Sequence, residues 1–446
     1  MDMESKTLRK NLWEAIEPMW SVDFHSHIPI GGESAGSMAR LLCYHYSETD
    51  AMNAGMSYEE YRAQGDWEAK ARFLIPYFPL SIGTTTYAGL HEVARGLFGF
   101  EQRITPDTWE ALCDAADPRM REEGWLNDAL KANRIAYVFG TNDPFEELKG
   151  AQPWYQPCLR VDKFINLQEH ALSDTVQDLS EVTGKDIATL SDFSDAMDTR
   201  FGGFKESGAV SIAVSLPPDF SLEAGALSPE GVFERILAGS LVSTDDLHTL
   251  RTRLFYTALD LCRKYGFVFQ LMLGVVRQVH RGVGNCGDGL TLHPEMFRTF
   301  WEPLNTYPDV RFDFTVLSAS DQHQLCVLVK NFPNAVLSGM WWYCNTPSII
   351  EAALRMRLEL VGAHCQNGQN TDAYMIEQGY YKMRQYKRAL VRTLAAMIED
   401  TFFTETEALD IARALLFDNP VRHFGLNRKE IEENIRRISP QRHRDR

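Results

Sequence analysis

The chain has 446 residues and a formal net charge of −16, with 44% hydrophobic and 24% charged residues. This composition supplies enough apolar side chains for a sizeable core and excludes wholesale disorder. The negative charge makes nucleic acid and anionic membranes poor partners, whereas a small anionic substrate could still bind beside local arginines.

Targeting and redox signals are few. No run of about 18 apolar residues occurs, and residues 1–10 lack the apolar stretch of a signal peptide. The eight cysteines are scattered and form no CxxC pair, which is typical of buried free thiols. We therefore expect a cytoplasmic protein without a membrane span.

Short apolar runs alternate with amphipathic segments along the chain. The first run, Met19–Phe24, is followed by a turn at Pro29, Gly31 and Gly32. Further strands are expected at Ile135–Phe139, Ser211–Leu216, Gly266–Leu273, Phe312–Leu317 and Ala335–Met340. Helices are expected at Leu250–Tyr265, Gln322–Phe332 and Ile349–Leu360. This repeated order predicts an α/β fold, a (β/α)8 TIM-like barrel of parallel strands.

Two regions interrupt the alternation. Residues 41–134 are helix-rich, with helices expected at Tyr58–Arg72 and Tyr87–Phe98, and residues 168–206 are polar and helical. We interpret both as helical insertions over one barrel face of a single domain, 1–446; separate domains are the alternative. Two more helices are expected within Gln385–Gly425, and residues 427–446 are expected to be a charged, solvated tail.

The strongest chemical signal is His25-x-His27 at the end of the first strand. Alternate residues of a strand point the same way, and twist at its end lets both imidazoles converge on one ion. In a barrel this position lies at the C-terminal face, where barrel enzymes hold their active sites. The pattern therefore predicts a metal site.

Further motifs follow in a fixed order along the chain. They are Asp23-Phe24-His25-Ser26-His27, His45-Tyr46, Thr141-Asn142-Asp143-Pro144, Leu159–Phe164, Gln270–Arg277, Gly339–Asn345, Thr371-Asp372 and Asp418-Asn419-Pro420. Together they resemble the uronate isomerase (glucuronate isomerase) family of the amidohydrolase superfamily. The resemblance runs from Asp23 to Phe424 and implies a metal-dependent barrel enzyme that interconverts an aldose and a ketose.

The resemblance also implies roles for single residues. The metal ligands would be His25, His27 and Asp372, a set that suits Zn²⁺, with Mn²⁺ as the other candidate. The catalytic residues would be Tyr46, Asp372 and Arg277. Substrate would be bound by His45, Arg277, Trp341 and Trp342. Because Cys365–Asn370 is polar and a poor strand, His364 and Asp313 remain rivals to Asp372 as the third ligand.

The chain departs from the family pattern at several substrate-binding positions. Met272 stands where the family has His, Tyr374 where it has the Arg of T-D-S-R, and Thr49 where it has another Arg. The segment matching the family's S-D-H-G contains Ala213 and Val214 and has neither the Asp nor the His. These replacements predict a more apolar pocket than a uronate requires.

Three functions remain open. Isomerisation of a uronate or related sugar acid by a homo-oligomeric enzyme is the first hypothesis. The alternative is a metal-dependent hydrolase or lyase acting on a small ester, lactone, amide or carboxylate, which the lost sugar-binding groups favour. The third is a catalytically inactive relative with a binding role, against which the intact His-x-His pair argues.

Overall fold

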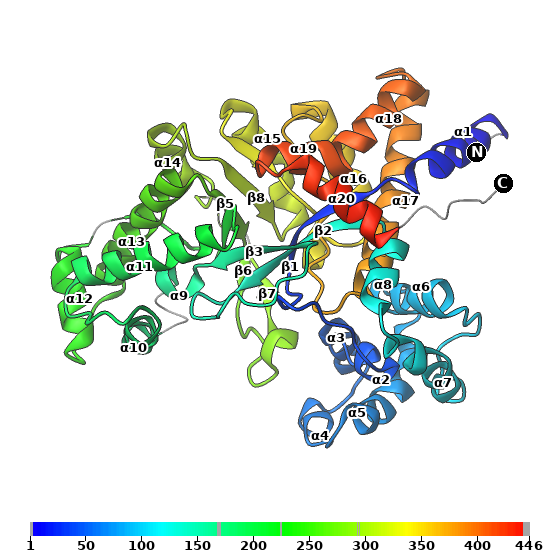
Figure 1. Ribbon diagram of the computed structural model, residues 1–446, viewed down its shortest axis with the longest axis horizontal. Helices are drawn as coiled ribbons and strands as arrows, with labels where there is room; N and C mark the ends of the chain where they lie inside the picture. Colours follow the sequence, from blue (N-terminus) through cyan, green and yellow to red (C-terminus); the bar gives the residue numbers. More distant parts are fainter. Residues whose placement is uncertain (1–2, 167–170, 224, 292, 294, 440–446) are drawn as a thin grey trace.

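A curled parallel sheet forms the centre of the molecule (Figure 1). The computed structural model describes residues 3–166, 171–223, 225–291, 293 and 295–439. The sheet has seven strands in the order β1-β2-β3-β4-β5-β8-β9. They are β1 Ser21–Ser26, β2 Ile135–Asn142, β3 Tyr155–Arg160, β4 Ser211–Leu216, β5 Val268–Leu273, β8 Phe312–Val316 and β9 Ala335–Leu337. All of the paired neighbours run parallel, as the alternation of strands and helices predicts.

The expected strands are confirmed, and their ends shift. β4 has the predicted bounds, whereas β1 continues two residues past Phe24, so that His25 lies inside the strand rather than after it. Strand β3 was missed by the sequence analysis, because Pro157 interrupts its apolar pattern and proline argues against a central strand.

An irregular segment, residues 365–373, closes the sheet between β9 and β1. At one end, Leu337 N donates to Cys365 O and Asn367 N donates to Leu337 O, at 2.9 and 2.7 Å. At the other end, Asp372 N donates to His25 O and His27 N donates to Ala373 O, at 3.1 and 2.7 Å. The barrel expected from the sequence is confirmed, and its eighth position is this segment, which forms a single parallel bridge, Leu337 to Gln366.

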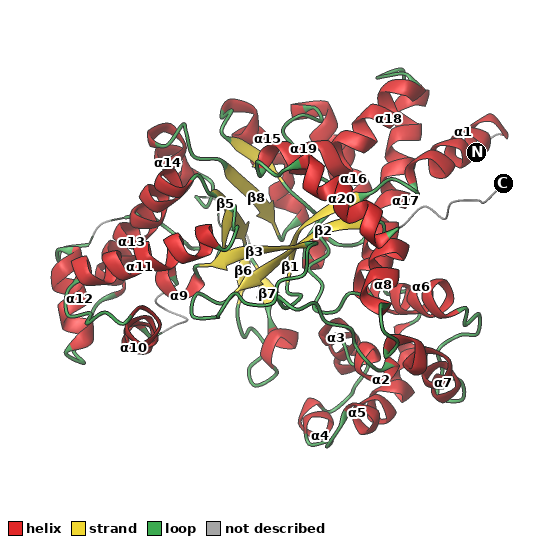
Figure 2. Cartoon of the chain, viewed as in Figure 1, coloured by secondary structure: helices red, strands yellow, loops and turns green. Residues whose placement is uncertain are grey.

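Helices surround the strands (Figure 2). In chain order they are α1 Met3–Ile16, α9 Asp162–Ile165, α12 Pro229–Leu237, α13 Thr244–Tyr265, α14 Trp301–Thr306, α15 Gln322–Asn331, α16 Pro347–Val361, α17 Gln378–Glu399, α18 Glu405–Arg413 and α19 Asn419–His423. The three helices predicted between and after the strands correspond to α13, α15 and α16. Among the described helices, none combines the length and apolar character that a membrane crossing requires.

The first interrupting region, all of which the structure describes, contains helices and no strand, and it lies at the lower right of Figure 1. It contains α2 Met38–Leu42, α3 His45–Asn53, α4 Tyr58–Arg62, α5 Trp67–Leu74, α6 Thr85–Phe98, α7 Trp109–Met120 and α8 Trp125–Asn133. The single helix expected at Tyr58–Arg72 is wrong. The chain breaks before α5 because the Asp66 carboxylate caps a new helix by accepting from Ala69 N at 2.8 Å.

The second region forms α10 Leu172–Thr183 and α11 Leu190–Glu206, while its first residues, 168–170, lie outside the described part of the chain. The expectation of a solvated tail over residues 427–446 needs correction. Arg428–Ile438 forms helix α20, and Ile431, Asn434 and Ile438 are buried on one face of it. Their spacing of three and four residues is that of a helix face packed against the barrel. Residues 440–446 lie outside the described part.

Candidate metal centre

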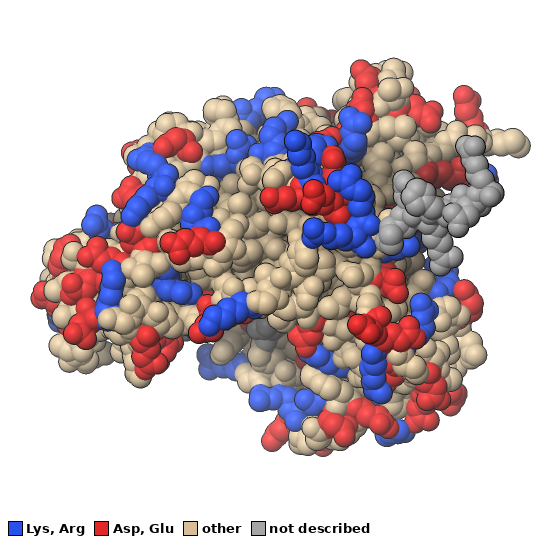
Figure 3. Space-filling model, in the orientation of Figure 1, with Lys and Arg blue, Asp and Glu red and all other residues tan. Residues whose placement is uncertain are grey.

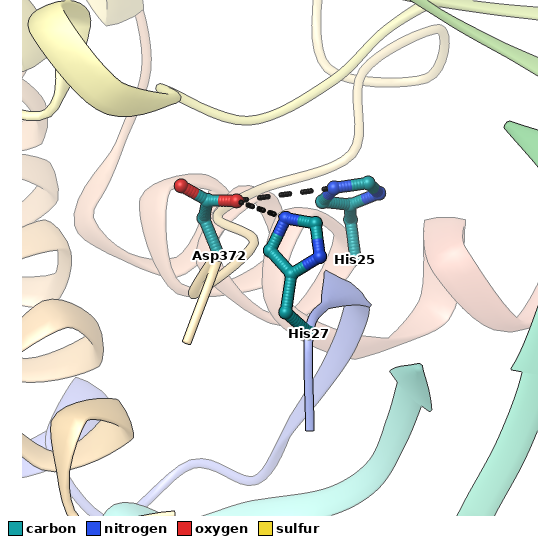
Figure 4. A group of neighbouring side chains, drawn as sticks. All are labelled: His25, His27 and Asp372. Carbon is teal, nitrogen blue, oxygen red and sulfur yellow. Dashed lines mark ion pairs between the residues drawn. The ribbon is translucent and has the colours of Figure 1, made fainter. Parts of the chain in front are cut away.

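His25, His27 and Asp372 meet at the C-terminal end of β1 (Figure 4). One ligand atom from each residue lies within 4.8 Å of the others. Asp372 Oδ1 is 3.9 Å from His25 Nε2 and 3.3 Å from His27 Nε2. The structure therefore brings together the three residues that the resemblance implies as ligands.

The two rival ligands lie elsewhere. The Asp313 carboxylate is buried and accepts hydrogen bonds from the Ser338 hydroxyl and the Gln270 amide. Burial raises the pKa of Asp313 to about 6. His364 lines a different cavity, beside α15 and α19. Asp372 thus has the position that a third ligand needs.

The backbone around Asp372 is held in an uncommon conformation. Asp372 has a φ of 50°, in the left-handed region that aspartate tolerates better than most residues. The preceding residue, Thr371, donates to the buried Asp23 carboxylate through both its backbone N, at 2.8 Å, and its hydroxyl. Asp23 of the first motif therefore fixes the loop that carries Asp372.

A hydrogen-bond relay determines which nitrogen of His27 faces the cluster. The Thr141 hydroxyl lies 3.0 Å from Ser26 O, to which it donates, and 2.9 Å from His27 Nδ1. With its proton committed to Ser26 O, Thr141 Oγ1 accepts from His27 Nδ1, so His27 Nε2 carries the free lone pair. This tautomer presents Nε2 to Asp372 as a metal ligand would be presented.

Two atoms of the cluster lack partners within the described chain. His25 Nε2 and Asp372 Oδ1 are buried and have no hydrogen bond. A buried polar atom without a partner is costly, and two such atoms facing the His27 lone pair fit a bound cation. The donor set of two imidazoles and one carboxylate is also a common one for a divalent metal.

Protonation favours metal binding as well. Burial, with His27 nearby, lowers the pKa of His25 to about 3, so its imidazole is neutral at pH 7. Burial acts to raise the pKa of Asp372, but nearby positive charge, including that of the buried Lys382, holds it below its ordinary value. The cluster therefore offers a neutral imidazole and an ionised carboxylate, the forms that bind a metal.

A cavity of about 160 Å³ opens beside the cluster. Its lining consists of His27, His45, Arg160, Ser215, Met272, Arg277, Trp341, Trp342, Asp372 and Tyr374. All four residues expected to bind substrate are among them.

Tyr46 is placed differently from the other expected site residues. Its hydroxyl donates to Asp372 Oδ2 at 3.2 Å. Its ring stacks on Trp342 with centroids 6.3 Å apart and lines a neighbouring cavity of about 350 Å³. Thr49 also lines this neighbouring cavity. Tyr46 therefore contacts Asp372 directly, but it is not among the described residues that line the smaller cavity.

Two arginines reach the smaller cavity, and each is anchored by a carboxylate. Arg277 Nη1 lies 2.6 Å from Asp288 Oδ2. Arg160 donates to both oxygens of Asp162, at 2.8 and 3.1 Å. Arg160 was not assigned a role from the sequence, although it ends the missed strand β3 within a quoted motif. A guanidinium has five N–H donors in a planar fork, which is why arginine suits anionic ligands.

The prediction of an apolar pocket is wrong. Val214 packs into the apolar cluster that contains the Ile212 and Leu216 side chains, away from the cavity. Ala213 packs under the cavity with Met272, and the next residue, Ser215, lines the cavity wall. Strand alternation is the reason, since only every second residue of β4 faces the barrel interior. Arginine, histidine, serine and aspartate side chains make this wall polar.

Two further residues lie at the site, and the sequence did not predict a role for either. Tyr374 packs flat over His27, with ring centroids 4.7 Å apart. Lys382 is buried and donates to Tyr44 Oη at 2.9 Å and to Asp372 O at 3.1 Å. Burial lowers the pKa of Lys382 to about 8. A lysine within an amphipathic helix such as α17 carries no sequence signal of burial.

The comparisons with known proteins identify the family and the fold. The model of the glucuronate isomerase family matches residues 5–424. The uronate isomerase of Thermotoga neapolitana is 20% identical over 366 residues, covering 79% of this chain and 81% of that protein. The crystal structure of uronate isomerase from Thermotoga maritima covers 95% of this chain and 100% of its own, with 20% identity and a TM-score of 0.84. Glucuronate isomerase from Caulobacter crescentus also has a TM-score of 0.84, with 17% identity and 95% of both chains covered. Because the family model spans most of the sequence, the chain belongs to the glucuronate isomerase family.

Proposed function

We propose that the protein isomerises a hexuronate of the glucuronate or galacturonate type between its aldose and ketose forms. The observation that carries the proposal is the presence of Arg160 and Arg277 in the same small cavity as His27 and Asp372. Guanidiniums suit the carboxylate and hydroxyl oxygens of a sugar acid, and membership of the family supports the reaction.

The reaction moves a proton from C2 to C1 of the open-chain sugar, and the hydroxyl proton from O2 to O1. We assign the carbon proton transfer to the Asp372 carboxylate, which lines the cavity. Tyr46 orients this carboxylate through its hydrogen bond to Oδ2. Arg277, with Arg160, donates hydrogen bonds to the substrate carboxylate, and Trp341 and Trp342 form an aromatic wall for the sugar.

His45 has a binding role in this proposal. Burial lowers the pKa of His45 to about 3, so its neutral ring can donate to or accept from a sugar hydroxyl. The same residue packs edge-on to Tyr374, with centroids 5.3 Å apart. The two rings limit the height of the cavity above His27.

His25, His27 and Asp372 would hold a divalent metal, for which we propose Zn²⁺, with Mn²⁺ as the alternative. When bound, such an ion supplies a positive charge that polarises substrate oxygens. The two imidazoles and the carboxylate support Zn²⁺ because they are the donors this ion prefers.

The direct test is turnover of D-glucuronate and D-galacturonate by the metal-loaded protein, with the ketose product followed by NMR. We expect ketose with at least one of these sugars, and no product from the His25→Ala/His27→Ala protein. If neither sugar reacts while an aldonolactone or a simple ester is hydrolysed, the metal-dependent hydrolase hypothesis replaces the isomerase.

Three features of the whole protein are proposed with this function. Residues 1–446 form one barrel domain, in which residues 41–134 and 168–206 are insertions. The exposed side chains of Trp301 and Val327, which line a common groove, support a homo-oligomer that light scattering can detect. All eight cysteines are free, which supports a cytoplasmic location.

A further inference from the structure

A second cavity, of about 520 Å³, lies at the opposite end of the barrel from the metal cluster. Arg311, which lines it, directly precedes β8, and Ala335, which also lines it, begins β9. His25 and His27, in contrast, lie at the C-terminal end of β1. Because all paired strands of the sheet run parallel, the two cavities are at different ends and form separate sites.

The charged side chains of this second cavity are all basic. Arg311, Lys330 and Arg422 line it, and no described residue in its wall is Asp or Glu. Figure 3 shows Lys and Arg side chains gathered over α15 and α19, next to this region. Three cations in one cavity, with the buried Asp313 as the one carboxylate that acts electrostatically on Arg311, are unusual for a chain whose net charge is −16.

The nearby acidic groups are engaged elsewhere. Asp418, four residues before Arg422, pairs with Arg413 at 3.0 Å and with Arg428. Asp313, one strand residue beyond Phe312, is bonded inside the barrel to Ser338 and Gln270. Neither carboxylate forms an ion pair with the cavity arginines in the described structure.

The cations themselves keep donors free for a ligand. The hydrogen bonds of Arg422 all use Nη2, which donates to His364 O and to Asn419 Oδ1 and lies 3.2 Å from His423 Nε2. Arg311 and Lys330 have no side-chain hydrogen bond or ion pair to any described residue. Burial lowers the pKa of Arg311, the charge of Arg422 adds to this effect, and the charge of the buried Asp313 opposes it.

His423 supports the cavity without adding charge. It is buried, and burial together with Arg311 and Arg422 lowers its pKa to about 3. In its ring, Nδ1 lies 2.7 Å from Asn367 Oδ1, and Nε2 lies 3.0 Å from His364 O and 3.2 Å from Arg422 Nη2. His364 O and Asn419 Oδ1 accept from Arg422 Nη2, so the Arg422 guanidinium is held at the rim of the cavity rather than rotating freely.

Apart from His364 and His423, the remaining residues of the wall are apolar. Phe332, Pro333, Val336 and Leu360 line it. Three cations are matched better by a dianionic phosphate than by a single carboxylate, and the apolar residues fit an organic group attached to it.

We propose that this cavity is a second binding site, distinct from the metal centre, that takes a small organic phosphate. The phosphoryl oxygens contact Arg311, Arg422 and Lys330, and the organic group packs on Phe332 and Leu360.

Isothermal titration calorimetry with phenyl phosphate tests the site. Titrations use the metal-loaded wild type and the His25→Ala/His27→Ala protein, in which a bound metal cannot capture the phosphate. We expect equal affinity for both, with inorganic phosphate and benzoate each binding more weakly than phenyl phosphate. Arg311→Gln and Lys330→Gln should each weaken phenyl phosphate binding, by roughly tenfold for the arginine, since one charge-assisted contact is lost.

The matched control is Arg298→Gln, because Arg298 is an exposed arginine paired with Glu295 outside the cavity. Lys330 is exposed, so its substitution tests the site even if Arg311→Gln impairs folding. Loss of binding in the His25→Ala/His27→Ala protein, or unchanged affinity in both Arg311→Gln and Lys330→Gln, overturns the proposal. Equal affinity for inorganic and phenyl phosphate would refute the organic part of it.

Discussion

The Tyr46 hydroxyl donates to Oδ2 of Asp372 at 3.2 Å, while Oδ1 of the same carboxylate faces His25 and His27. One oxygen thus contacts the helical region between β1 and β2, through α3, and the other faces the histidines of the barrel. This division means that the helical region orients Asp372 without supplying a ligand.

Replacement of Tyr46 by Phe should lower kcat by roughly 10- to 100-fold, because the Asp372 carboxylate loses the contact that orients it. Metal content should stay at the wild-type level, since Oδ1 and both histidines remain. Steady-state kinetics and elemental analysis check the two parts. Tyr61→Phe is the control, because Tyr61 lies in the same helical region and donates to Glu48 instead, at 2.6 Å. A Tyr46→Phe enzyme with wild-type kcat would contradict the orienting role.

Replacement of Thr141 by Val preserves the shape of the side chain but removes the acceptor for His27 Nδ1. We expect about a tenfold weaker metal affinity, because the ring loses the bond that fixes its tautomer and orientation. Competition with a chromophoric chelator measures the change. In the control, Thr315→Val removes a hydroxyl that donates to Ser338 O inside the same barrel. An equal loss of affinity in both variants would point to general destabilisation rather than to the Thr141 relay.

Replacement of Arg160 by Lys should raise KM for the uronate by about tenfold, because lysine cannot reproduce the two parallel bonds to Asp162 while facing the cavity. The effect on kcat should be smaller if Arg160 binds ground state and transition state alike. Arg263→Lys, at an exposed pair with Asp309, is the control. An unchanged KM in the Arg160→Lys enzyme would remove this residue from substrate binding.

The lowered pKa of the buried Lys387 implies that the stability of the protein depends on pH. It is buried in α17 and donates to Glu17 O and Met19 O, and burial lowers its pKa from 10.5 to about 7. Between these pKa values the unfolded chain binds more protons than the folded chain, so this group makes the wild type more stable as pH rises from 7 to 10. The gain approaches 1.4 kcal/mol per pH unit.

The Lys387→Met protein should lack this contribution. The free energy of unfolding of both proteins is measured with urea at pH 7, 8 and 9. The value for the wild type should increase relative to the value for the variant as the pH rises. Lys264→Met serves as the control, because Lys264 lies at the surface beside Asp198. A difference that stays constant with pH would mean that Lys387 is not titrated on unfolding.

Much of the fold could be predicted from periodicity. Short-range patterns correctly predicted the apolar strands β4 and β8 and the amphipathic helix α16. Such patterns depend only on neighbouring residues, so the tertiary structure does not change them. Strand β3 was missed because Pro157 argues against a central strand. The break before α5 was missed because it depends on a single contact, the cap that Asp66 forms inside a helical pattern.

The candidate site divides in the same way. The sequence alone determined that His25 and His27 share one end of a strand, because their spacing and the strand period require it. Its ordered motifs also pointed to Asp372, Arg277 and His45. Only the tertiary structure decided that Tyr46 contacts Asp372 rather than the cavity, that Val214 faces away from it and that Arg160 lines it. The physical reason is that these relations join residues more than a hundred positions apart, or depend on which face of a strand turns inward, and neither is encoded by neighbouring residues alone.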